Sequence, residues 1–197
     1  MSEYIDKLTE KWGPFVKCGE CLSNGRMPFI SSEARLNAFF TPKMTSDVSF
    51  FFANSLKSEE HPELKDIYAW TNGCRLFFAS LCIYGIRDEK DKDILVPFDL
   101  KVENDNLSKN MPVDKYLFFA SIGGEYVFGY DRYNPSEVYG MRVGDKTILQ
   151  SFDGVKDFFD HYFYPLMEEY DEKCKKIHPT EAYRGIPVLE NKTIELM

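Results

Sequence analysis

The sequence has 197 residues, 44% of them hydrophobic and 28% charged, which is the composition of one folded globular domain. Its net charge of −8 argues against a nucleic-acid-binding protein, because such a protein needs a basic surface to displace counterions from phosphates. The sequence shows no signal-peptide pattern and no apolar run approaching about 20 residues, and its five cysteines lack regular spacing. We therefore expect a cytoplasmic protein that does not associate with a membrane.

The first third of the chain is expected to be mainly helical. Ser2 can cap a helix in which Ile5, Leu8 and Trp12 share one apolar face, and Gly13-Pro14 stops this helix. Residues 13–30 are expected to form a loop. Apolar residues at helical spacing, with residues that start or stop a helix, predict three further helices, over residues 32–41, 46–56 and 62–71.

After Gly73 the apolar pattern changes from helical spacing to that of strands. Arg75 to Tyr84 is apolar on both faces and predicts one buried strand. Because short turns separate the later candidates, neighbouring strands are expected to pair as an antiparallel meander. The expected strands cover residues 75–84, 94–98, 115–121, 125–131, 136–143 and 146–150. With the helices, they predict a single-domain α+β fold with a mostly antiparallel sheet of about six strands.

Gly123 and Gly124 allow two interpretations, a phosphate-binding loop or a turn between strands. A phosphate-binding loop needs a helix directly after its glycines, because the free N–H groups of that helix bind the anion. The residues that follow (EYVFGYD) alternate like a strand, with Tyr126, Phe128 and Tyr130 on one face. The pattern therefore favours a hairpin turn.

The last helix is expected to begin at Ser151, with Asp153 in its first turn. Apolar side chains recur at i, i+3, i+4, i+7 and i+8, at Val155, Phe158, Phe159, Tyr162 and Phe163. Pro165 is expected to kink or end the helix, which can resume over residues 166–176. Residues 177–197 are expected to form an extended tail.

No residue pattern indicates catalysis or metal binding. Cys18 and Cys21 form a Cys-x-x-Cys pair, but a structural zinc needs four ligands and no second pair follows. The three histidines, His61, His161 and His178, lie in unrelated contexts without a catalytic or nucleotide-binding motif. We therefore predict that the protein is not an enzyme and needs no cofactor or metal.

Acidic residues are concentrated in two segments. Residues 88–93 (DEKDKD) form a charged loop, and residues 151–172 carry seven acids against the single base Lys156. Each segment can be an ordinary solvated surface. The alternative is an electrostatic landing surface for a basic protein, since charge complementarity speeds association and selects the partner.

Several short motifs occur in a suggestive order. A helix ends in Asn72-Gly73, a strand ends in Ile83-Tyr84-Gly85-Ile86, and Pro97-Phe98-Asp99-Leu100 follows. Then come Phe118-Phe119-Ala120-Ser121, the Gly-Gly hairpin, Val138-Tyr139 and Ser151-Phe152. This order over about residues 60–165 resembles the SUKH superfamily, which includes fungal cell-wall-synthesis regulators and bacterial immunity proteins. The resemblance implies an α+β domain with one bent sheet and a role in binding a protein, commonly a toxin.

We predict a SUKH-like core over residues 59–176, a helical extension packed on it over residues 1–58, and a tail over residues 177–197. The predicted function is that of a non-catalytic immunity protein, monomeric or weakly dimeric, that neutralises a basic, nuclease-type toxin. A regulatory or scaffold module without a toxin partner is the alternative. The predicted partner-binding residues are aromatic or acidic: Asp88, Glu89, Asp91, Glu103, Asp105, Glu125, Tyr126, Tyr130, Asp131 and Tyr133.

Overall fold

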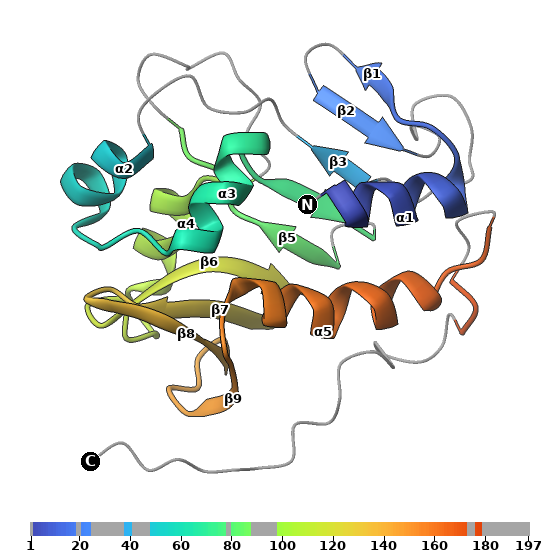
Figure 1. Cartoon of the computed structure of the whole chain (residues 1–197). Coiled ribbons are helices and arrows are strands. Elements are labelled where there is room, and N and C mark those ends of the chain that lie inside the picture. The colour runs from blue at the N-terminus through green and yellow to red at the C-terminus, as the bar shows by residue number, and fades with distance from the viewer. Residues whose placement is uncertain are drawn as a thin grey trace.

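The structure is a computed structural model that describes residues 2–18, 21–24, 38–40, 48–77, 80–87, 98–172 and 176–178. These residues form one antiparallel sheet with several helices (Figure 1). The predicted α+β fold and antiparallel meander are therefore confirmed. Within the described residues no helix is both long enough and apolar enough to span a membrane.

Within the described residues the sheet has nine strands, and each strand pairs with the strands next to it in the sequence. The strands are β1 (Val16–Cys18), β2 (Cys21–Asn24), β3 (Ala38–Phe40), β4 (Cys74–Leu76), β5 (Leu81–Ile83), β6 (Tyr116–Ile122), β7 (Tyr126–Asp131), β8 (Asn134–Arg142) and β9 (Ile148–Phe152). The helices are α1 (Ser2–Trp12), α2 (Val48–Phe51), α3 (Pro62–Trp70), α4 (Leu100–Leu107) and α5 (Val155–Glu168), with a π-helical turn, η1 (Phe52–Leu56), directly after α2.

The N-terminal part contributes strands that the sequence did not predict. Strands β1 and β2 lie where a loop was expected, and β3 lies at the end of an expected helix whose residues 32–37 are outside the described part. Apolar runs as short as Ala38–Phe40 fit either a helix or a strand, so pairing with neighbours decides. Here β3 pairs with β2 and β4, which joins the N-terminal strands to the rest of the sheet.

The single strand predicted over residues 75–84 is instead the hairpin of β4 and β5. Its turn contains Phe77, which adopts the left-handed backbone conformation with φ 53°. That conformation is rare for a bulky side chain, so the sequence gives no turn signal. Phe77 is fully buried, with its ring centroid 5.4 Å from that of Phe163 and 6.1 Å from that of Trp12. This packing stabilises the strained turn.

Helix α4 was not predicted, and the expected strand over residues 94–98 lies outside the described residues except for Phe98, which is not in a strand. Asp99 caps α4, because its carboxylate accepts hydrogen bonds from the backbone N–H groups of Lys101 and Val102. Helix α4 lies against β6, where the buried Asn104 amide bonds to both the N–H and the C=O of Phe118. The Asn104 side chain thus makes the two backbone hydrogen bonds with Phe118 that a neighbouring strand would otherwise make.

Two apolar clusters lie on opposite faces of the sheet. The larger one contains the buried faces of α1, α3 and α5, including all five residues of the predicted α5 stripe. The smaller one contains Met111, Val127 and Met141 among others. Strand β7 alternates between them as predicted, since Phe128 and Tyr130 belong to the larger cluster and Val127 to the smaller.

The prediction of a hairpin at Gly123-Gly124 is confirmed. Both glycines have positive φ, 59° and 73°, and β6 pairs with β7 directly across the turn. The two glycines therefore connect β6 to β7. The element that follows them is a strand, not the helix that a phosphate-binding loop requires.

Asn72 and Gly73 attach the end of α3 to the segment after β5. The Asn72 side chain donates a hydrogen bond to the carbonyl of Ile86 at 2.7 Å and accepts one from its N–H at 2.6 Å. Gly73 has φ 87°, and a Cβ there would lie 2.8 Å from the backbone nitrogen of Gly85. Two of the motifs that carry the family resemblance, Asn72-Gly73 and Tyr84-Gly85, are thus in contact.

The last helix begins four residues later than predicted. Residues Ser151 and Phe152 end β9, and α5 starts at Val155 after the N-cap Gly154, which has no side chain to cap the helix. Pro165 lies inside α5, which continues to Glu168.

The first and last helices lie side by side (Figure 1). The Tyr4 hydroxyl donates to Asp160, the Lys11 ammonium to the carbonyl of Met167, and the Trp12 indole to the carbonyl of Asp171. Tyr4 and Leu8 are also buried in the main core. Residues 1–58 therefore supply part of the core as well as strands of the sheet.

Candidate functional site

Seven of the ten predicted partner-binding residues lie in the described part of the chain, on α4 and around β7. Asp88, Glu89 and Asp91 lie outside the described residues. Glu103 and Asp105 are on α4, where Asp105 is exposed and pairs with Lys101 at 2.5 Å. Burial, reinforced by nearby Asp99, raises the pKa of the Glu103 carboxyl.

The predicted residues around β7 divide between its two ends. Glu125 is exposed at the β6–β7 turn and Tyr126 is half-buried against the main core, whereas Asp131 and Tyr133 are about 17 Å further along the strand direction. Tyr133 is 70% exposed, but Tyr130 is 0% exposed and its hydroxyl donates to the carbonyl of Glu59 at 3.1 Å. Tyr130 is thus a core residue and offers no free surface to a partner.

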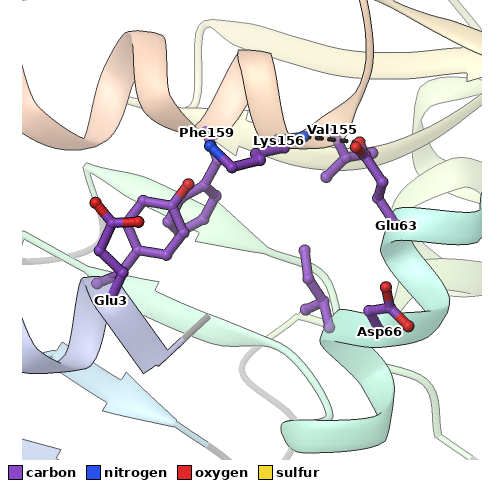
Figure 2. A pocket seen from close by; sticks show the side chains of 8 residues that line it. Glu3, Glu63, Asp66, Val155, Lys156 and Phe159 are labelled. Carbon is purple, nitrogen blue, oxygen red and sulfur yellow. Dashed lines mark hydrogen bonds between the residues drawn. The ribbon is translucent and has the colours of Figure 1, made fainter.

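A cavity of about 210 Å³ lies among α1, α3 and the start of α5 (Figure 2). Its lining combines apolar walls with acidic groups: Glu3, Tyr4, Glu63, Asp66, Ile67, Val155, Lys156 and Phe159. Three lining residues are carboxylates and one is an ammonium. Figure 2 shows Glu63 and Asp66 on one side of the cavity, Glu3 on the other, and Lys156 crossing between them.

Helix α3 supplies two of the carboxylates because Glu63 and Asp66 are three residues apart and share one helix face. The helix starts at Pro62, and the Nδ1 atom of His61 caps it by accepting a hydrogen bond from the N–H of Glu63 at 3.3 Å. Burial lowers the pKa of His61, partly offset by the Glu63 carboxylate. The neutral imidazole of His61 therefore fixes the start of α3, and with it the helix face that carries Glu63 and Asp66.

Glu63 also caps α5 from outside that helix. Its Oε2 accepts a hydrogen bond from the backbone N–H of Lys156 at 2.8 Å. A Cβ on Gly154 would lie 2.7 Å from this oxygen, so the missing side chain leaves space for Glu63. A carboxylate at this position interacts favourably with the positive end of the helix dipole, and it replaces the cap predicted at Ser151.

Lys156 does not neutralise the lining carboxylates, because its ammonium pairs with Asp160 at 2.5 Å. Asp160 also accepts a hydrogen bond from Tyr4. Burial opposes ionisation of Asp160, but the bonds from Lys156 and Tyr4 prevail and lower its pKa. Burial, together with the bond to Asp160, raises the pKa of Tyr4. The Lys156–Asp160 pair therefore leaves a net negative charge at the cavity.

Two of the three carboxylates have partners within the protein. Glu63 accepts from the N–H of Lys156, and Glu3 accepts a hydrogen bond from the Tyr164 hydroxyl at 3.0 Å. Asp66 is exposed and has no hydrogen bond or ion pair within the described part of the chain. Asp66 is thus the carboxylate that is most available to a ligand.

This arrangement suits binding of a small, positively charged group. Pockets for metabolites and cofactors usually measure about 300–1,000 Å³, which is more than this cavity offers. In the part of the chain that the structure describes, no group of three or more His, Cys, Asp or Glu side chains converges as a metal site. Apolar walls with carboxylates around them match the stem and the head of a basic side chain.

Sequence reasoning missed Glu3, Glu63 and Asp66, because the cavity joins three segments that are far apart in the chain. The acid pair three residues apart on a helix was the available signal. Of the two acidic segments in the sequence, residues 151–172 contribute to this site, since they supply Lys156 and Asp160.

No protein family model and no curated protein matches this sequence.

Proposed function

We propose that this protein is a cytoplasmic immunity protein of the SUKH type, which binds and neutralises a basic toxin by covering its working surface, without catalysis of its own. The ordered motifs of the sequence support the family assignment. A further support is that two of these motifs, Asn72-Gly73 and Tyr84-Gly85, pack directly on each other, with the Gly73 Cα and Gly85 backbone too close for a Cβ. This contact explains why position 73 requires a glycine.

The observation that carries the proposed function is the acidic cavity among α1, α3 and α5. Its carboxylates are presented at an apolar hollow, and Lys156 is already paired with Asp160. An acidic surface of this kind favours encounter with a basic protein and selects against acidic ones. Toxins that cleave nucleic acids need basic surfaces to hold phosphates, so they are the chemical class that this surface suits.

Co-expression with the protein encoded by the adjacent gene tests the proposal. We expect that protein to arrest growth when it is expressed alone, growth to recover on co-expression, and a stoichiometric complex to be isolated from the same cells. A complex with a neighbour that is harmless alone would favour the regulatory or scaffold function instead. Growth arrest that co-expression does not relieve would contradict the proposal.

The charge argument can be tested in the same cells with the protein itself. Asp66→Lys reverses the most available carboxylate of the cavity, and we expect it to weaken protection. Glu168→Lys is the matched control, because Glu168 is exposed on α5 and lies about 13 Å along the helix from Phe159. At that distance exposed charges are largely screened at physiological salt.

A further inference from the structure

We infer that the cavity among α1, α3 and α5 is a receptor for one arginine side chain of a bound protein. This inference deepens the proposed function and rests on it, since it names the group by which the partner is held. It assigns the cavity to a side chain, and so excludes a metabolite or a metal as the ligand.

The size of the cavity fits a single long side chain. At about 210 Å³ the cavity is smaller than the roughly 300–1,000 Å³ of most pockets for whole small molecules. The apolar walls come from Tyr4, Ile67, Val155 and Phe159, which are buried residues of the main core. A side chain with an aliphatic stem gains by removing this surface from water, while its charged head stays near the rim.

The carboxylates are placed to receive several donors from different directions. Glu63 and Asp66 lie on α3, and Glu3 lies on α1 across the cavity (Figure 2). Each carboxylate has two oxygens with about four acceptor sites, so the bonds from Lys156 to Glu63 and from Tyr164 to Glu3 leave capacity unused. The carboxylate of Asp66 makes no hydrogen bond or ion pair within the described part of the chain, so all of its acceptor sites are available.

The same geometry favours arginine over lysine. A guanidinium has five N–H donors fixed in a plane, so it can bond to carboxylates on two sides at once, whereas an ammonium is a compact point charge. The walls include the rings of Tyr4 and Phe159, whose centroids are 4.6 Å apart. Because these rings pack edge to face on each other and are almost fully buried, the preference for arginine rests on its hydrogen bonds to the carboxylates.

An NMR titration of the full chain with N-acetyl-arginine amide tests the inference without any partner protein. Free arginine amide should bind in the millimolar range, because one side chain buries little area. We expect saturable shifts confined to the backbone amides of residues 3–4, 63–67 and 155–159. N-acetyl-citrulline amide, which has nearly the same shape without the charge, should cause none, and N-acetyl-lysine amide should bind more weakly.

Variants then locate the contact. Asp66→Asn should weaken arginine amide by about threefold to tenfold, since one charged acceptor is lost, and Asp66→Lys should abolish saturation. Glu168→Gln removes the same charge from a distant site and should leave the affinity unchanged. No saturable shift at tens of millimolar, equal binding of the citrulline amide, or equal loss in both Asp66→Asn and Glu168→Gln would overturn the inference.

The outcome separates this inference from the proposed function. A toxin complex that forms equally well with Asp66→Lys overturns the arginine receptor and leaves the immunity function intact. If the complex is lost in Asp66→Lys, replacing single arginines of the partner by lysine should reproduce that loss at one position. A partner in which no single arginine matters would overturn the inference.

Discussion

Position 73 requires a glycine because of its backbone conformation and its close packing. It has φ 87°, and a Cβ would lie 2.8 Å from both the backbone nitrogen of Gly85 and the carbonyl oxygen of Ile83. We therefore expect Gly73→Ala to lower the free energy of unfolding by about 3 kcal/mol or more, from backbone strain and steric overlap together. Gly124→Ala is the matched control, because Gly124 has φ 73° but open space around it, and should cost about 1–2 kcal/mol. Urea unfolding measures both, and equal losses would contradict the steric argument.

His61 makes the stability of the protein depend on pH. Its Nδ1 must stay unprotonated to cap α3, and burial lowers its pKa in the folded state. The stabilising contribution is therefore fully present above about pH 6.5, the ordinary value for histidine, and is lost as the pH falls towards the lowered folded value. In His61→Asn the amide can still cap the helix but does not titrate.

We expect the free energy of unfolding of the native chain to fall between about pH 7 and pH 5 by more than that of His61→Asn. Groups that titrate in both proteins cancel in this comparison. Parallel pH profiles would show that His61 protonation is not linked to unfolding.

Among the secondary-structure elements, α5 depends on α3 for its cap. We expect Glu63→Ala to destabilise the protein by about 1–2 kcal/mol, because the N–H of Lys156 loses its acceptor and the helix dipole loses a compensating charge. Glu63→Gln keeps an acceptor and should cost roughly half as much. Glu168→Ala, at the other end of α5, is the control and should change little. Faster hydrogen exchange at residues 155–158 in Glu63→Ala would locate the effect, and unchanged exchange there would contradict it.

The strands from β6 onwards were predictable because their signals are local. Alternation along Tyr126–Tyr130 and two glycines with positive φ define the hairpin, and the α5 stripe repeats at helical spacing. The β4–β5 turn was not predictable, since Phe77 adopts φ 53° only through its burial against Phe163. Strands β1–β3 are only three or four residues long, and their pairing with each other decides their conformation.

The site was less predictable than the fold. The sequence indicated an acidic partner surface, but its predicted residues are Asp88, Glu89 and Asp91, two residues of α4, and five residues around β7, of which Tyr130 is in the core. In the folded protein Glu63 reaches from α3 to the start of α5, and its carboxylate occupies the space beside Gly154. Neither fact follows from periodicity, because both arise from contacts between segments about 90 residues apart.

For the molecule as a whole, the charge of −8 predicts how fast it meets a basic partner. Reversing the charges of Asp88, Glu89 and Asp91 together should slow association. The effect should be larger at low salt than at high salt, because the Debye length is shorter at high salt. The control reverses three exposed carboxylates elsewhere, Asp114, Glu137 and Asp145. Stopped-flow association with the proposed basic partner measures both rates. Equal slowing in the two variants would mean that only net charge matters, and that residues 88–93 have no specific part in the encounter.

The contact between α1 and α5 also affects how the chain folds during synthesis. Strands pair with their neighbours in sequence, so the sheet can grow while the chain leaves the ribosome. Tyr4, however, bonds to Asp160, which is 156 residues later. At roughly 5–20 residues per second, translation takes on the order of 10 seconds or more to reach it. During that interval α1 lacks its contacts with α5, and the two helices can pack together only after α5 has been synthesised.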